Sequence, residues 1–238
     1  MQASYFIRKA IYYLRHKPII LNEPGLQRML PCIPGWLEKG HIYCFDYATK
    51  KIPENYPILE IGTFAGLSTN VMLYFLKKYK KNNVLYTTDW YLRDIQPDEN
   101  ICYLKDPCSL SGFLKESFVR NTRFFNPDAP IFSYDFPSDD FFAWWNSQAE
   151  QTDLFGNTTK PAGKIAFAYI DGNHQYDYAK RDFENVDSIL IPGGFILFDD
   201  SAGYTRWGSR YVAIEALKSG KYRVIKQNPH YFVQKVGG

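Results

Sequence analysis

The sequence predicts an α/β protein whose mostly parallel sheet carries helices on both faces, a doubly wound arrangement. Two observations lead to this prediction. From residue 57 onward, short apolar runs of strand length alternate with helical patterns. The last two runs, YRVIKQ and YFVQKV, are joined only by NPH, which predicts that the chain ends in an antiparallel hairpin.

The parallel strands are expected where apolar runs end in polar or glycine residues. These runs cover residues 57–62, 83–88, 130–135, 165–170 and 195–198. Helical patterns separate them at residues 65–81, at 110–121, from Ser138 onward, over 179–190 up to the PGG that should end that helix, and at 210–220. Residues 90–109 read as a long loop.

Length and composition limit the protein to one main domain. We expect an N-terminal helical extension over residues 1–50 and the α/β domain over 51–238. A net charge of +3 without a basic stripe argues against nucleic acid. No apolar run approaches the roughly 20 residues that span a bilayer. Four cysteines without a CxxC pair, and no signal peptide, suit the reducing cytoplasm.

The first 18 residues fit an amphipathic helix. Phe6, Ala10, Tyr13 and Leu14 should form its apolar face, with basic residues elsewhere. We expect this face to dock on the helix's own domain or on a sister subunit, which would make the protein a homo-oligomer. Binding to an anionic membrane surface is the weaker alternative.

A glycine-containing turn, EIGTFAGLS, joins the first strand to the first helix of the domain. Gly62 permits a tight turn, Gly66 removes a side chain where the helix meets a ligand, and the helix start offers free N–H groups. Phe64 occupies the second glycine position of GxGxxG and would crowd a pyrophosphate. A P-loop is excluded because GK[ST] is missing.

Asp89 follows the second strand, at the place where an acid binds ribose hydroxyls in doubly wound folds. Trp90 beside it is placed to pack on a nucleobase. These positions predict a nucleoside ligand without a pyrophosphate. The alternative is an ordinary turn followed by a solvated aspartate.

Three carboxylates follow the last two parallel strands. Asp171 and Asp199 end consecutive strands, so their side chains should converge, and Asp200 joins them only if the chain turns there. Such an oxygen cluster suits Mg²⁺, or Mn²⁺ or Ca²⁺. His174, three residues after Asp171, is the candidate general base. The alternatives are solvated turn acids and a helix-capping histidine.

The motifs ILEIGTFAGLST, YTTDW, SDDFF, YIDGNHQY and PGGFILFDD resemble the class I S-adenosylmethionine-dependent methyltransferases. They are most similar to small-molecule O-methyltransferases of the macrocin O-methyltransferase and cephalosporin hydroxylase-like group. This resemblance implies a seven-stranded sheet and a cofactor pocket lined by Glu60, Gly62, Ser68 and Asp89, with Asp135 near the adenine. The full predicted cofactor-binding set is Glu60, Gly62, Thr63, Phe64, Gly66, Ser68, Asp89, Trp90, Asp135 and Asp171.

The resemblance also implies a reaction. In metal-dependent relatives, acids at the positions of Asp171, Asp199 and Asp200 hold the ion, whereas catechol-type relatives have lysine where this chain has His174. We therefore expect metal-assisted methyl transfer from S-adenosylmethionine to a hydroxyl of a sugar, glycosylated metabolite or polyphenol, with His174 and Asp171 as catalytic residues. One alternative is a non-catalytic nucleoside-binding subunit. Another is a hydroxylase-type protein, although a two-histidine, one-carboxylate iron site is not evident in the sequence.

Overall fold

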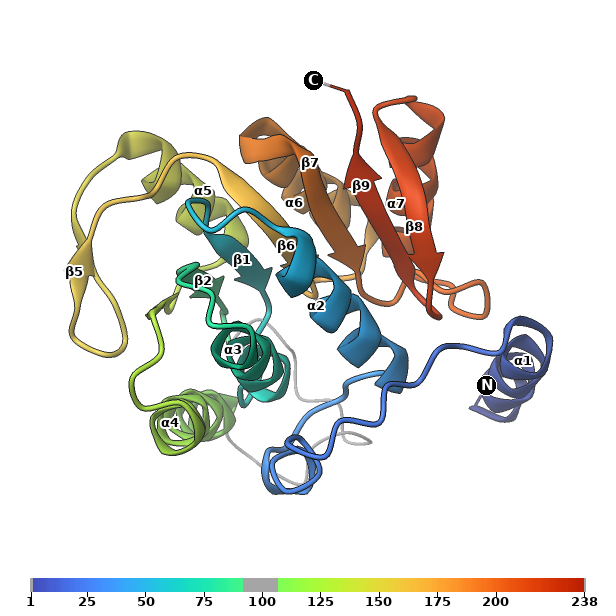
Figure 1. The fold of residues 1–238 in the computed structure, drawn as a ribbon, viewed down its shortest axis with the longest axis horizontal. Coiled ribbons are helices and arrows are strands. Elements are labelled where there is room, and N and C mark those ends of the chain that lie inside the picture. Colours follow the sequence, from blue (N-terminus) through green and yellow to red (C-terminus); the bar gives the residue numbers. More distant parts are fainter. Residues whose placement is uncertain (1, 92–106, 238) are drawn as a thin grey trace.

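A computed structural model describes residues 2–91 and 107–237 and contains the expected seven-stranded sheet (Figure 1). The strand order is β3-β2-β1-β6-β7-β9-β8. The first five of these strands are parallel, and β9 runs antiparallel to both β7 and β8. The strands are β1 (Ile58–Ile61), β2 (Leu85–Thr88), β3 (Ile131–Tyr134), β6 (Ile165–Ile170), β7 (Leu190–Phe198), β8 (Tyr222–Gln227) and β9 (Tyr231–Lys235). The predicted fold class is confirmed.

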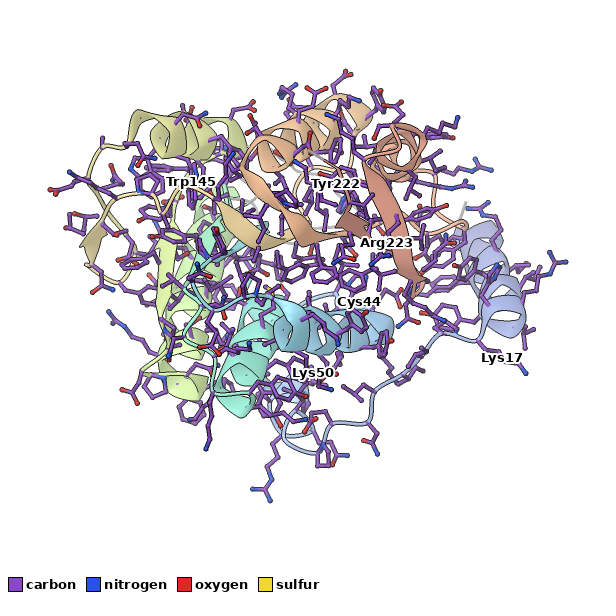
Figure 2. All side chains as sticks on the ribbon, turned by 45° about the horizontal axis from the view of Figure 1, so that its top comes forward. Lys17, Cys44, Lys50, Trp145, Tyr222 and Arg223 are labelled. Carbon is purple, nitrogen blue, oxygen red and sulfur yellow. The ribbon has the colours of Figure 1, made fainter. Side chains whose placement is uncertain are left out.

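Helices cover both faces of the sheet (Figure 1). One face carries α2 (Lys39–Lys51), α3 (Leu67–Lys78) and α4 (Pro107–Phe125), and the other carries α5 (Ser138–Ser147), α6 (Tyr176–Ile189) and α7 (Gly208–Lys218). Each face has its own hydrophobic cluster. Cys44 belongs to the first cluster, and Trp145 and Tyr222 lie across the sheet in the second (Figure 2).

Two local predictions differ from the structure. Helix α4 is longer at both ends than the predicted 110–121, and the rest of the expected loop, residues 92–106, lies outside the described residues. The PGG expected to end a helix, at residues 192–194, lies inside β7. Helix α6 ends earlier, at Ile189. The connector before β6 contains a short hairpin of β4 (Gln151–Thr152) and β5 (Thr158–Thr159).

Helix α1 (Gln2–His16) docks on its own chain through tyrosines. Tyr5 and Tyr12 pack edge-on against Tyr204, with ring centroids 5.6 and 5.3 Å apart. Phe6 and Leu14, predicted on the docked face, are instead 63% and 77% exposed. Of the predicted face, Ala10 is exposed too, and Tyr13 alone contacts the domain, where its hydroxyl donates to Glu38 at 2.6 Å. The prediction of the docked face was therefore only partly correct. An oligomer formed through α1 stays a prediction.

Helix α2 packs on the sheet and meets the β8–β9 loop at Gly40. The Asn228 side-chain amide donates to the carbonyl oxygens of Gly40 and Ile19, at 2.9 Å each. A Cβ at Gly40 would lie 1.9 Å from the Asn228 carbonyl oxygen, so only glycine allows this approach. The predicted domain boundary at residue 50 falls at the end of this helix and stays a prediction. No helix among the described residues is long and apolar enough to cross a membrane.

Replacing Gly40 with alanine should therefore separate α2 from the hairpin loop. We expect Gly40→Ala to lower the free energy of unfolding by about 1–3 kcal/mol, since backbone must move to admit the methyl group. Urea denaturation measures this loss. The matched control is Gly112→Ala on α4, where a Cβ meets nothing within 4 Å and alanine should be neutral or stabilising. Equal midpoints for the two variants would contradict the packing argument.

Candidate active site

The ends of β6 and β7 bring Asp171 and Asp199 together. Ile170 pairs with Phe198 in the parallel register, so the next residue of each strand leaves the sheet at the same edge. The Asp199 N–H donates to the Ile170 carbonyl at 2.9 Å and the Asp171 N–H to that of Ile61 at 2.8 Å, which fixes both backbones. The predicted convergence of these two strand ends is present.

His174 lies between the carboxylates. Its Nε2 is 3.4 Å from Asp200 Oδ2 and 3.8 Å from Asp171 Oδ1. The chain turns at Asp200, whose φ is 47°, and this places Asp200 beside His174. One ligand atom each from Asp171, His174 and Asp199 lies within 4.8 Å of the others, which is close enough to share an ion. This set does not include Asp200, whose role as a metal ligand stays a prediction.

Ser209, which the sequence analysis did not single out, orients His174. Its N–H donates to the His174 carbonyl at 3.3 Å, and its Oγ lies 3.5 Å from His174 Nδ1. This approach requires Gly208, because a Cβ there would lie 2.2 Å from the backbone nitrogen of Tyr176. The only signal in the sequence is a glycine and a serine at the start of a helix, which is too common to indicate a site.

Burial and mutual repulsion set the protonation of the acids. Burial, followed by the negative charge of Asp199, raises the pKa of Asp171 well above its usual range. Burial works against ionised Asp199 as well, but His230, whose Nδ1 lies 2.7 Å from Oδ1, more than offsets it and holds the pKa of Asp199 well below normal. Asp199 is therefore ionised. Asp171 stays protonated unless a nearby positive charge stabilises its carboxylate.

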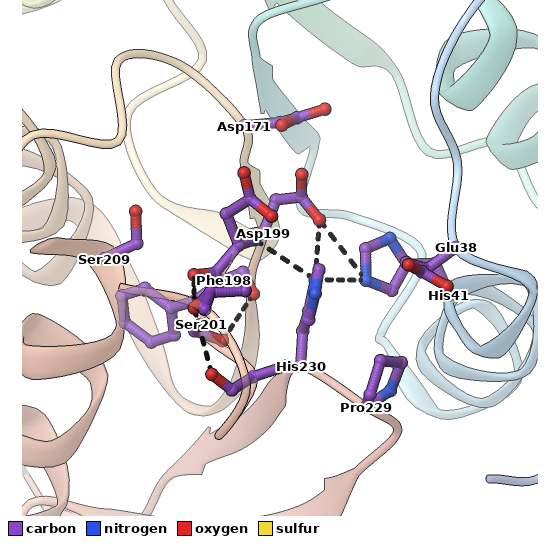
Figure 3. Close-up of polar contacts among 12 residues, drawn as sticks. Glu38, His41, Asp171, Phe198, Asp199, Ser201, Ser209, Pro229 and His230 are labelled. Carbon is purple, nitrogen blue, oxygen red and sulfur yellow. Dashed lines mark hydrogen bonds and ion pairs between the residues drawn. The ribbon is translucent and has the colours of Figure 1, made fainter. Parts of the chain in front are cut away.

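A buried network extends from Asp199 under α2 (Figure 3). His230 Nδ1 is 2.7 Å from Asp199 Oδ1 and 2.9 Å from His41 Nε2. His41 Nδ1 is 3.3 Å from the Tyr169 hydroxyl, which donates to Asp171 Oδ2 at 3.0 Å. Burial lowers the pKa of His41 to about 4, so this ring is neutral near pH 7. The structure thus corrects the expectation that no two-histidine, one-carboxylate group is present.

The glycine turn lies beside this cluster. A Cβ at Gly62, whose φ is 86°, would lie 2.1 Å from the Asp171 carbonyl oxygen, so glycine is required for both conformation and space. Gly66, with a φ of 91°, immediately precedes α3. The turn therefore holds the start of α3 and the end of β6 at one edge of the sheet.

Asp89 binds the turn from the end of β2. Its Oδ2 accepts the N–H groups of Thr63 and Phe64 at 2.6 and 2.7 Å, and its Oδ1 accepts that of Tyr91 at 2.5 Å. The carboxylate is thus not solvated, contrary to the alternative weighed from the sequence. Among the described residues, the Tyr91 N–H donates to Oδ1, which has a further lone pair for a second donor.

The remaining predicted cofactor residues lie around this turn. Glu60 is fully buried and accepts the hydroxyls of Ser68 and Thr69, both at 2.5 Å, so it supports the start of α3 from below. Trp90 is partly buried at the end of β2, and Asp135 follows β3 and pairs with Lys115 at 3.1 Å. Their contacts with a ligand stay predictions.

The strand order and the glycine turn and acids at the strand ends are those of the class I methyltransferase fold. The profile of the methyltransferase-domain family matches residues 59–201, more than half of the chain, and the chain belongs to this family. No curated protein matches significantly.

Solved O-methyltransferases share the whole architecture. The calicheamicin enzyme CalS11, a TDP-rhamnose 3'-O-methyltransferase, superposes with a TM-score of 0.58 at 14% identity, over 100% of this chain and 94% of its own. TomG from Streptomyces achromogenes, solved with SAM, gives 0.55 at 13%, over 96% of each chain. An enzyme from Bacillus cereus, solved with SAH, gives 0.56 at 13%, over 96% and 97%. At these identities the likeness establishes the fold.

Glu60 should make stability depend on pH. Burial raises its pKa from 4.5 to about 8, so the folded protein keeps a proton that the unfolded chain releases. The free energy of unfolding should therefore fall as pH rises from about 4.5 to about 8. Glu60→Gln, which is neutral throughout, should flatten this decline in thermal melts. Glu116→Gln, the same change at an exposed position on α4, should follow the parent protein. A parent-like decline in Glu60→Gln would show that another group is responsible.

Proposed function

We propose that this protein transfers a methyl group from S-adenosylmethionine to a hydroxyl of a small molecule. The observation that carries the proposal is the position of His174, which faces clustered carboxylates beside the glycine turn of a methyltransferase domain. The sulfonium supplies an already activated methyl group. The protein must therefore bind and deprotonate the poorer partner, the acceptor hydroxyl.

The residues at the turn fit the cofactor. The close approach of Gly62 to Asp171 leaves no side chain between the end of β1 and the end of β6. The lone pair remaining on Asp89 Oδ1 suits a ribose hydroxyl, and Trp90 beside it suits an adenine ring. The start of α3 presents backbone N–H groups to polar groups of the amino-acid end.

The acid cluster fits a divalent cation. Carboxylates of Asp171, Asp199 and Asp200 supply the oxygen donors that Mg²⁺, Mn²⁺ or Ca²⁺ prefer. A bound cation would lower the pKa of an acceptor hydroxyl and remove the repulsion that raises the pKa of Asp171. The metal dependence is part of our proposal.

His174 acts as the general base. Its Nε2 faces the acids, and Ser209 at Nδ1 limits rotation of the ring. Neutral imidazole accepts the hydroxyl proton at Nε2, and the neighbouring carboxylates stabilise the imidazolium that forms. Asp171 orients His174 and the acceptor.

One solved neighbour supports the acceptor class that we propose. The likeness to a TDP-rhamnose methyltransferase supports a sugar or glycosylated metabolite, and a polyphenol offers the same hydroxyl oxygens. For the compartment, we retain the reducing cytoplasm as our proposal. A non-catalytic nucleoside-binding subunit would bind the cofactor without needing His174, so the two functions predict different results for one variant.

His174→Gln should separate binding from turnover. Loss of the general base should lower kcat by about 10²–10⁴-fold while calorimetric affinity for S-adenosylmethionine stays near that of the parent protein. The readout is methyl transfer to a panel of sugar and phenolic acceptors. His16→Gln, at an exposed position at the end of α1, is the matched control. Unchanged turnover in His174→Gln would remove this residue from the mechanism, and absence of cofactor binding by the parent would refute the function itself.

Removal of metal should abolish turnover reversibly. Treatment with EDTA should stop methyl transfer and added Mg²⁺ should restore it, because the acceptor hydroxyl loses its activating cation. Asp200→Asn should raise the Mg²⁺ concentration for half-maximal rate by at least about tenfold. Asp140→Asn, an exposed acid on α5, should not change it. Full activity of EDTA-treated protein would eliminate the metal from the proposal.

A further inference from the structure

His41 and His230 have no role in the proposed reaction, yet both lie against Asp199, which the reaction does use. The three residues come from α2, from the β8–β9 loop and from the end of β7, so three distant segments converge on one point (Figure 3). All three residues are buried. Two of the three donor atoms are imidazole nitrogens, whereas the acid cluster offers carboxylate oxygens. We propose that these residues form a second cation site, specific for a nitrogen-preferring transition metal such as Zn²⁺, Co²⁺ or Fe²⁺.

The spacing of the three donor atoms fits one ion. His230 Nδ1 is 2.7 Å from Asp199 Oδ1, His41 Nε2 is 2.9 Å from His230 Nδ1, and His41 Nε2 is 3.4 Å from Asp199 Oδ1. Ligands bonded to one metal at about 2.1 Å lie about 2.9–3.4 Å apart, for octahedral or tetrahedral angles. The triangle therefore already has nearly the edge lengths of a metal-bound set.

Hydrogen bonds alone do not satisfy this group. Asp199 Oδ1, an acceptor, requires a proton on His230 Nδ1, whereas the Asp200 N–H, which points at the same nitrogen from 3.1 Å, requires a lone pair there. No tautomer of His230 meets both demands. A cation would let the imidazole lone pair and the carboxylate charge face the same positive ion, and the long 3.1 Å bond from the Asp200 N–H would give way to it.

The second nitrogen of His41 is held as metal-binding histidines require. His41 Nδ1 lies 3.3 Å from the Tyr169 hydroxyl, whose own proton goes to Asp171. The hydroxyl oxygen therefore accepts from His41 Nδ1–H, which leaves the lone pair on Nε2, the atom facing His230 and Asp199. A fixed tautomer of this kind is the usual outer partner of a metal-bound imidazole.

The two cation sites would share Asp199. Its Oδ1 belongs to the imidazole group, and one of its oxygens also lies within 4.8 Å of donor atoms of Asp171 and His174. Two imidazoles and one carboxylate select transition metals, whereas the neighbouring carboxylates select Mg²⁺. The protein should thus bind two different metals side by side.

The first experiment is a Co²⁺ titration of the full chain in excess Mg²⁺, followed by visible absorption. We expect one equivalent of Co²⁺ to bind while Mg²⁺ occupies the acid cluster. His41→Gln and His230→Gln should each weaken Co²⁺ binding by more than about tenfold, and the exposed control His16→Gln should leave it unchanged. Circular dichroism and S-adenosylmethionine binding confirm that the variants fold. Co²⁺ binding that is absent in the parent protein, or unaffected in both variants, overturns the proposal.

A second measurement needs no variant. Pulsed electron paramagnetic resonance of the parent protein loaded with one equivalent of Cu²⁺ should detect two coordinated imidazoles. The acid cluster offers only His174, so a spectrum with one imidazole or none also overturns the proposal. Methyl transfer assayed with Mg²⁺ alone is independent of this outcome. The second site and the proposed function therefore fail or stand separately.

Discussion

The parallel pairing of β6 with β7 is the constraint on which the rest of the site depends. With Ile170 opposite Phe198, Asp171 and Asp199 must leave the sheet side by side, in a setting where burial penalises their charges. Polar side chains around the two aspartates offset this penalty. His230 stabilises ionised Asp199, Tyr169 donates to Asp171, and His174 faces Asp171 and Asp200. The sheet register thus concentrates negative charge, and the surrounding elements compensate for it.

Much of this arrangement could be read from the sequence, because it follows from the order of elements. Parallel strands end at a common edge, so Asp89, Asp171 and Asp199 could be placed there from the apolar runs that precede them. The sequence also predicted a tight turn that needs glycine at residue 62. The cause of this need, the passage of the Asp171 backbone 2.1 Å from a would-be Cβ, belongs to tertiary structure and has no local signature.

The parts that escaped prediction involve residues distant in sequence that meet only in the fold. His41 and His230 are 189 positions apart, and neither lies in a recognisable motif. They meet because Gly40 admits the hairpin loop and Asn228 bonds to that backbone. The docked side of α1 was partly mispredicted for a similar reason. Its partner, Tyr204, belongs to a segment about 190 residues further along the chain, so the pattern of the helix alone does not show which of its sides meets Tyr204.

The carboxylate of Asp89 has a consequence for how a ligand enters. Because it accepts the N–H groups of Thr63 and Phe64, the loop between β1 and α3 has its conformation fixed before a nucleoside binds. Both of these bonds use Oδ2, so a ribose hydroxyl that donates to Oδ1 leaves them in place. The loop is therefore preorganised, and binding of the sugar need not spend free energy on ordering it.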